Sequence, residues 1–294
     1  MFRFRLVVLG FTFAALGAAC RNAPPPMAQG HDDFGHALAI DHRPERIVSL
    51  NPTTTEMLFA LGAGSRLVGR SQYDVFPDSA RAVPDVGPAM RPNIEAVLAQ
   101  HPDLVLLYAS DDNRAAYDRL TAAKVPAFAF KIDSIEQFAR DTRLIGSLLG
   151  DSARAEATVD TIEATLRRVR AMTSALPHPT VFIHAWDKPI IAIGGGSFLS
   201  ELLDIAGAKN IYGDSPLPSL TVSLEDVVRR NPDFMLASPT AAPKIEASAT
   251  WRAIPAVHNG HVLVYDTTIV GRPSVQLGAA AYSLARLLHP REVK

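Results

Sequence analysis

The sequence holds one cysteine, Cys20, and no block of basic residues within its 294 positions. A single cysteine leaves no internal disulfide, even in a compartment where disulfides form. Lysine and arginine number 29 against 30 aspartate and glutamate residues, so the charge is nearly balanced. Nucleic-acid binding proteins gather basic residues into a patch, and this sequence has no such patch, which argues against that partner.

Motifs of catalysis are scarce as well. The sequence contains no G-x-S-x-G turn, and no nucleophile stands near a base. Gly194, Gly195, Gly196 and Ser197 precede an expected helix, but the lysine and the spacing of a phosphate-binding loop are missing. A tight turn into a helix explains these glycines better. The sequence therefore indicates a protein that is not an enzyme.

Residues 1–20 read as a signal peptide rather than as part of the fold. Arg3 and Arg5 precede an apolar stretch from Leu6, and small residues stand before Cys20. The apolar stretch is too short for a membrane span. We therefore expect the mature protein to work outside the cytoplasm.

Cys20 follows three small residues, which resembles the lipidation signal of bacterial lipoproteins. The leucine of that signal usually stands three places before the cysteine, and here Leu16 stands four places before it. Ordinary secretion with a chance cysteine is the alternative. Residues 21–31 are proline-rich at their start and predict a tether between a lipid anchor and the folded part.

Strands and helices alternate along the rest of the chain, which predicts parallel β-sheets and the α/β class. In the first half, Thr53 and Glu56 have the spacing of a capping box, and Gly62 stands where that helix should stop. The strands expected there are 46–50, 66–69, 103–108 and 125–130, and the further helices are 93–101, 115–123 and 134–150. The second half predicts strands 181–185, 210–213, 233–237 and 261–266, with helices at 197–207, from Ser223, and at 275–290.

One module occurs twice. PNIEAVLAQHPDLVLL at 92–107 matches TVSLEDVVRRNPDFMLA at 221–237, which aligns Glu95 with Glu225. Upstream of these modules, Glu56 precedes Gly62 as Glu201 precedes Gly207. Two matched pairs in the same order predict two similar α/β lobes, at residues 32–150 and 175–294.

Residues 151–174 are expected to join the lobes as one long helix. Ala155, Val159, Ile162, Leu166 and Val169 recur at steps of four and three, which places them on one face. Asp151 can cap the start of this helix. Twenty-two residues would extend about 33 Å, enough to lie along both lobes.

These stretches resemble one family. Residues 33–50, 44–87, 92–107, 194–214 and 251–266 are similar to periplasmic binding proteins of ABC importers for vitamin B12 and iron chelates. The resemblance covers roughly residues 32–290. It implies two Rossmann-like lobes bridged by one long helix, a ligand in the cleft between them, and a monomer that delivers a metal chelate from the periplasm to a permease dimer.

The resemblance gives the repeated module a role. In that family one exposed glutamate on each lobe docks into the permease, and the matching positions are Glu95 and Glu225. The alternative is that each carboxylate merely complements a helix N-terminus, an effect of about 0.3–1 kcal/mol.

Ligand contacts are expected at loops that follow the strands, where open α/β sheets place their ligands. Aromatic rings there bury area on a flat chelate, and arginine pairs with carboxylate or phosphate. Core packing of Trp186 and a structural ion pair of Arg272 are the alternatives. The candidates are Asn51, Thr53, Tyr73, Met90, Arg91, Trp186, Asp187 and Arg272, with Pro52, Pro88 and Ala89 nearby.

The sequence departs from the family pattern at three places, two of which concern its corrinoid-binding members. Those relatives often carry tryptophan six residues before each docking glutamate, where this chain has Ala89 and Ser219. The family's RPGPR-like turn reads RPSVQ from Arg272, without its second arginine. Cobalamin is thereby disfavoured, while haem and ferric siderophores stay open.

A binding protein for bare zinc or manganese is the alternative function. It would need cleft histidines, and the best placed is His184 at a strand end, although a satisfied core histidine is the more ordinary role. The other paired histidines are His31 with His36 and His258 with His261, and neither pair has the spacing of a strong metal motif.

Overall fold

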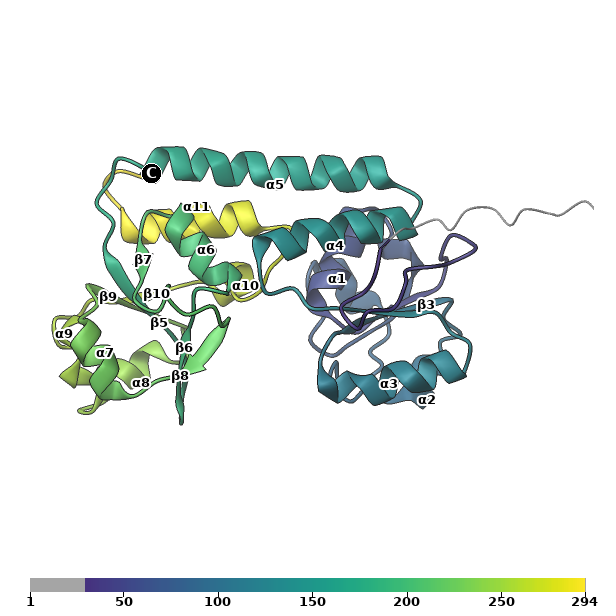
Figure 1. Ribbon diagram of the computed structural model, residues 1–294, viewed down its shortest axis with the longest axis horizontal. Coiled ribbons are helices and arrows are strands. Elements are labelled where there is room, and N and C mark those ends of the chain that lie inside the picture. Colours follow the sequence, from purple (N-terminus) through teal and green to yellow (C-terminus); the bar gives the residue numbers. More distant parts are fainter. Residues whose placement is uncertain (1–29, 294) are drawn as a thin grey trace, which may run out of the picture.

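The computed structural model of the protein describes residues 30–293 (Figure 1). The predicted signal peptide, Cys20 and most of the predicted tether lie outside the described residues. The described chain forms two α/β lobes, with one long helix lying along both (Figure 1). This arrangement confirms the predicted fold class.

The N lobe is a parallel sheet with helices on both faces. Its strands run in the order β2-β1-β3-β4, and every pair is parallel. The strands are β1 (Ile47–Ser49), β2 (Leu67–Arg70), β3 (Leu104–Tyr108) and β4 (Ala127–Phe130). The helices are α1 (Pro52–Ala60), α2 (Ile94–Leu98), α3 (Asp111–Ala122) and α4 (Ile135–Leu148), with 3₁₀ turns at Gly64–Arg66 and Asp78–Ala82.

The C lobe repeats that plan and adds to it. Strands β7, β5, β9 and β10 pair in parallel in the order of the N lobe, and β6 and β8 extend the sheet antiparallel beyond β5. The strands are β5 (Thr180–Asp187), β6 (Ile190–Ile193), β7 (Lys209–Asn210), β8 (Ser219–Thr221), β9 (Phe234–Ala237) and β10 (Val262–Val264). The helices are α6 (Phe198–Ile205), α7 (Leu224–Arg230), α8 (Ala242–Ala247), α9 (Pro255–His258), α10 (Thr267–Val270) and α11 (Leu277–Leu288), with a 3₁₀ turn at Trp251–Ala253.

The repeated Pro-Asp break has the same structural role in both lobes. Asp103, before β3, accepts hydrogen bonds from the backbone amides of Glu45 and Arg46, at 2.8 and 2.9 Å. Asp233, before β9, accepts from the amide of Thr180 at 2.7 Å and from its hydroxyl at 2.8 Å. Each aspartate thus ties the start of one central strand to the start of its neighbour.

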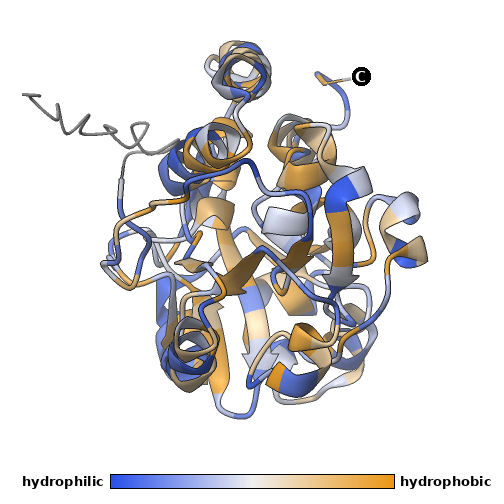
Figure 2. Cartoon of the chain, turned by 90° about the vertical axis from the view of Figure 1, so that its right-hand side faces the viewer, coloured by the Kyte–Doolittle hydropathy of each residue, from blue (hydrophilic) through white to orange (hydrophobic). Residues whose placement is uncertain are grey.

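Helix α5 (Ser152–Thr173) joins the lobes and covers both of them. It packs on α4 of the N lobe and on α11 and α6 of the C lobe. The predicted stripe is confirmed, since all five of its side chains are buried. One hydrophobic cluster runs beneath α5 through both lobes, and each lobe has a separate outer cluster on the far side of its sheet. Apolar strands accordingly lie between helices in the view along the long axis (Figure 2).

Some sequence expectations need correction. The cap of α1 is Asn51, which accepts from the amide of Thr53, because Pro52 occupies the first helical position. Thr53 and Glu56 therefore form no capping box, and both side chains bond elsewhere. Within 210–213 only Asn210 is in a strand, and Trp186 with Asp187 belongs to β5 rather than to a following loop.

Candidate functional site

A cavity of about 580 Å³ lies between the lobes. Its size is within the range of small-molecule sites. Both lobes line it, so a change in their separation would change its width. The N lobe contributes Leu50, Asn51, Pro52, Thr53, Ala89, Met90, Tyr108, Lys131, Ile132 and Asp133, and the C lobe contributes Ile193, Ser197, Phe198, Pro218, Ser219, Gly271, Arg272 and Pro273.

The position of the cavity follows from the direction of the strands. Asn51 follows β1, Tyr108 ends β3, and Lys131 follows β4, so the carboxyl ends of three N-lobe strands open onto it. Open α/β sheets bind ligands at this edge. Four of the sequence candidates line the cavity: Asn51, Thr53, Met90 and Arg272.

Arg272 is held across the lobe boundary by a buried carboxylate. Its Nε donates to Oε1 of Glu56 at 2.6 Å, and its Nη2 contacts the same oxygen. The side chain of Glu56 is 0% exposed, and that of Arg272 is 26% exposed. Burial raises the pKa of Glu56 to about 7, against the opposing effect of Arg272. The predicted structural ion pair of Arg272 is therefore present, and Arg272 also lines the cavity.

Further hydrogen bonds cross between the lobes, including one from the amide of Phe198 to the carbonyl of Asp133. The Thr53 hydroxyl donates to the carbonyl of Pro273 at 2.9 Å and is buried. Glu201 of α6, which the repeat matches with Glu56, accepts a hydrogen bond from the amide of Ile135 at the start of α4, at 3.4 Å. Each matched glutamate of the repeat thus reaches the segment that opens the other lobe's last helix.

The remaining cations near the cavity are also paired. Lys131 lies 3.2 Å from Asp133, and both residues line the cavity. Arg91 lies beside Met90 in the chain, has a φ of 51°, and donates to Asp112 of α3 from Nε and Nη2. Arg91 lies outside the cavity lining, so a ligand contact there stays a prediction.

Trp186 is 62% exposed and lies on the cleft side of its sheet. It pairs with Ile191 across β5 and β6. Side chains two residues apart on a strand share a face, and Ile193 on that face lines the cavity. Trp186 is thereby a large apolar surface beyond the rim of the cavity, and its exposure contradicts the core-packing alternative.

Two sequence candidates lie away from the cavity lining. Tyr73, in the segment after β2, is 61% exposed. Asp187 lies 3.1 Å from Nε2 of His184, which is buried and packs against Trp251. The register of β5 shifts between His184 and Trp186, so these two side chains do not follow the usual alternation, and His184 is buried while Trp186 is exposed. Burial lowers the pKa of His184, while Asp187 opposes the shift. His184 is therefore a core residue, as expected, but it is not fully satisfied, because its buried Nδ1 has no hydrogen-bond partner.

The matched glutamates Glu95 and Glu225 stand in the first turns of α2 and α7. Both helices lie on the side of the molecule opposite α5, one on each lobe (Figure 1). Both side chains are exposed, and Glu95 pairs with Arg119 of α3. The pKa of Glu95 is lowered by its own backbone amide and by Arg119.

Metal-ligating side chains do not gather in the described part of the chain. Across residues 30–293, no group of three or more His, Cys, Asp or Glu side chains is placed to hold a metal ion. His36 stacks on Tyr117 at a ring distance of 4.4 Å, and His261 contacts the carbonyl of Asp233. The histidine pairs of the sequence thus have structural contacts of their own.

The glycine run before α6 is a packing feature. The amides of Gly194, Gly195 and Gly196 donate to the carbonyls of Pro218, Tyr212 and Leu217. A Cβ at Gly196 would lie 2.1 Å from the carbonyl oxygen of Pro216. These amides are therefore engaged by the protein itself, which leaves no donors for a phosphate and agrees with the expected tight turn.

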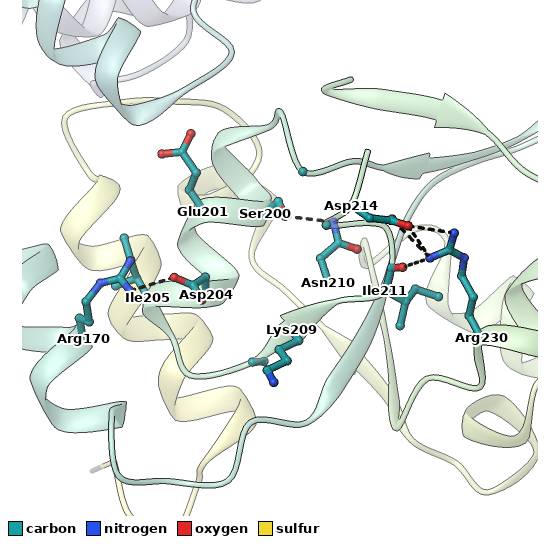
Figure 3. Close-up of a pocket in the computed structure, with 13 residues that line it drawn as sticks. Arg170, Ser200, Glu201, Asp204, Ile205, Lys209, Asn210, Ile211, Asp214 and Arg230 are labelled. Carbon is teal, nitrogen blue, oxygen red and sulfur yellow. Dashed lines mark hydrogen bonds and ion pairs between the residues drawn. The ribbon is translucent and has the colours of Figure 1, made fainter. Parts of the chain in front are cut away.

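A second cavity, of about 670 Å³, lies on the C lobe (Figure 3). Its charged groups largely neutralise one another, since Arg170 pairs with Asp204 at 2.9 Å and Arg230 with Asp214 at 3.3 Å. Its lining comes from α5 and the C lobe alone. Although it is the larger of the two, movement of the lobes cannot enclose a ligand in it, and the cleft cavity is the better candidate.

Several cavity residues escaped the sequence reading. Tyr108, Lys131 and Asp133 stand at the ends of predicted strands, so the strand-end rule applied to β3 and β4 would have found them. Ile193 and Ser219 belong to β6 and β8, which are short antiparallel strands that a βαβ pattern does not predict.

Known proteins resemble this chain in sequence and in fold. The profile of a family described as periplasmic binding protein matches residues 47–268. A vitamin B12-binding protein of Yersinia pestis is 29% identical over 207 residues, which is 70% of this chain and 74% of that protein. A possible iron-binding protein of Staphylococcus epidermidis aligns with a TM-score of 0.74 at 26% identity, over 84% of this chain and 100% of that chain. The periplasmic vitamin B12 binding protein of Vibrio cholerae aligns with a TM-score of 0.72 at 24% identity, over 84% of this chain and 97% of that chain.

Proposed function

The chain belongs to the periplasmic binding protein family, and we propose that it captures a metal chelate in the cleft between its lobes and delivers it to an ABC importer. The relatives named above are described as binding vitamin B12 or, for one, possibly iron. Capture needs a closable cavity and no chemical step, which fits a chain without a catalytic motif. The chelates proposed are a corrinoid, haem or a ferric siderophore.

The observation that carries this proposal is a cavity that both lobes line at the carboxyl ends of the N-lobe strands. Ala89 and Ser219, the positions where corrinoid-binding relatives often have tryptophan, both line it, one from each lobe. Small side chains there leave room for a ligand that differs from cobalamin in shape. We propose ligand contacts at Asn51, Thr53, Met90 and Arg272, with Tyr73 and Trp186 outside the rim and Arg91 and Asp187 as weaker candidates.

Delivery is proposed to use Glu95 and Glu225 as contacts with the two halves of a permease dimer. Their exposure on α2 and α7, on one side of the molecule, supports simultaneous contact. We place the protein in the periplasm as a monomer held at the membrane by a lipid on Cys20. No helix of residues 30–293 is long and apolar enough to cross a membrane.

A fluorescence titration of the purified protein tests the proposal. The panel comprises cyanocobalamin, cobinamide, haemin and several ferric siderophores, with zinc and manganese salts as the alternative cargo. Trp186 beside the cleft should be quenched on binding, whereas Trp251 is buried in the C lobe. A Trp186→Phe variant identifies the reporting residue.

Saturable binding of one chelate at micromolar concentration or below is the expected result. If only zinc or manganese binds, the cargo is a bare metal ion rather than a chelate. Failure of every ligand to bind would remove capture as the function of the cleft.

A further inference from the structure

The charges around the cleft are matched in pairs. Lys131 and Arg272 line the cavity, and Arg91 lies next to it. Their carboxylate partners are Asp133, Glu56 and Asp112, respectively. Among the described residues that line the cavity, every cation is therefore already in contact with a carboxylate.

The three pairs differ in how readily a ligand would break them. Lys131 and Arg91 have side chains that are 50% and 78% exposed. Exposed pairs contribute little free energy, so an anionic ligand would gain little by replacing either carboxylate. Arg272 faces a carboxylate that is fully buried. An anionic ligand that drew Arg272 away would leave Glu56 buried and uncompensated, which is strongly unfavourable.

From this pairing we infer that the cleft selects a metal chelate of zero net charge over an anionic chelate of the same size, and that Glu56 sets this preference by holding Arg272. The inference rests on the proposed function and narrows its ligand class. Glu56 lies behind Arg272 and is a positioning residue rather than a ligand contact.

The rest of the lining suits a neutral chelate. Asn51, Tyr108 and Ser219 supply uncharged polar groups, which match amide or hydroxamate oxygens. Met90 and Phe198 supply apolar surface for a flat face. Neutral corrinoids and neutral ferric hydroxamates share this chemistry, and separate arms of the experiment distinguish them.

The experiment compares ligands that differ in charge. Cyanocobalamin is titrated against its monocarboxylate, in which one side-chain amide is hydrolysed, and a neutral ferric trihydroxamate is titrated against an anionic ferric tricatecholate. The titrations are made at pH 8, above the pKa of about 7 that burial gives Glu56. We expect wild-type protein to prefer the neutral member of the pair that binds by about tenfold or more, because an anion can recruit Arg272 only by leaving Glu56 uncompensated.

Variants assign the preference to Glu56. Glu56→Gln leaves Arg272 uncompensated and should reduce the preference at least about fivefold, chiefly by tightening the anionic ligand. Glu201→Gln is the matched control, because Glu201 holds the same place in the C lobe and faces a backbone amide. It should leave the preference within about twofold of wild type.

A pH arm needs no substitution and guards against a misfolded variant. The groups that face Glu56 are Arg272, the Ser274 hydroxyl and Asp74. Lowering the pH from 8 to 6 protonates Glu56 and should move wild type toward the Glu56→Gln ratio, while Glu56→Gln itself stays unchanged.

The outcomes separate the two claims. If the anionic members bind as tightly as the neutral ones to wild type at pH 8, the neutral-ligand inference is wrong while capture of a chelate stands. If Glu56→Gln folds and keeps the wild-type ratio, Glu56 does not set the preference. If no chelate of either charge binds, the proposed function fails and this inference fails with it.

Discussion

Glu56 and Glu201 occupy matched places in the two lobes and have opposite surroundings. Glu56 is fully buried against an arginine of the other lobe, whereas Glu201 is half-buried against a backbone amide. The N lobe also buries Asp74 and Asp141. The lobes therefore share their strand order and their backbone ties, while buried charge is concentrated in one of them, which teaches that the repeat conserves architecture more closely than chemistry.

The largest expected effect concerns the proposed docking glutamates and tests whether both lobes contact the permease. Reversing both charges, Glu95→Arg with Glu225→Arg, should lower uptake by about tenfold or more while ligand affinity stays unchanged, because each substitution replaces a proposed carboxylate contact with the opposite charge. Uptake by cells and titration of the purified variant measure the two quantities. Glu136→Arg, an exposed first-turn glutamate on α4 near α5, is the control. Normal uptake by the double variant would refute docking through these residues.

Shortening a side chain in the hydrophobic cluster that both lobes share should destabilise both lobes by a similar amount. Leu166 on α5 is buried in the cluster that spans both, so Leu166→Ala should cost about 2–5 kcal/mol of unfolding free energy and lower the stability of both lobes together. Leu107→Ala in the outer cluster of the N lobe is the comparison. Hydrogen exchange resolved by segment reads the two lobes separately, and protection lost in only one lobe of Leu166→Ala would contradict a shared core.

The buried carboxylates should make stability depend on pH. Burial raises the pKa of Glu56 and of Asp141 to about 7 and that of Asp74 to about 6, against their hydrogen-bonding partners. A raised folded-state pKa means that the folded protein binds more protons, so this stabilisation is complete below pH 4 and is lost as the pH rises through 7. At about 1.4 kcal/mol for each pKa unit, these shifts correspond to roughly 3–4 kcal/mol for each group.

Denaturant titrations at pH 5.5 and pH 8 measure this effect, with the lower pH expected to be the more stable of the two. Asp141→Asn should reduce the difference, since the amide cannot ionise. A stability that rises from pH 5.5 to pH 8 in wild type would contradict the raised pKa values of these groups in the folded protein.

The smallest expected effect concerns the matched aspartates Asp103 and Asp233. Removing the charge of either should lower the unfolding free energy by a similar amount. Asp103→Asn and Asp233→Asn each weaken two charge-assisted bonds at the start of a sheet, and each should cost about 1–2 kcal/mol. Urea unfolding of the two variants measures both values. Costs that differ by more than about 2 kcal/mol would show that the two ties are not equivalent.

The sequence predicted the repeated plan because local signals carry it. Asp103 and Asp233, the glycines Gly62 and Gly207 with φ of 75° and 82°, and the stripe on α5 all depend on nearby residues. Contacts between distant segments were not predictable: Glu56 reads as a helix-cap residue until Arg272, 216 positions away, is placed beside it. Ligand contacts at Tyr73, Arg91 and Asp187 stay predictions, because a strand-end rule places loops and leaves side-chain directions open.

The cluster beneath α5 makes each half of the molecule incomplete. Leu148 of α4, Leu166 of α5 and Leu284 of α11 belong to one continuous apolar body. A free-standing lobe would present the apolar side of its last helix to water, and such a surface invites association with a second copy. If the two lobes arose by duplication of one ancestral lobe, that ancestor would have covered its apolar surface by forming a symmetric dimer. The connection through α5 would then have replaced a contact between two separate chains.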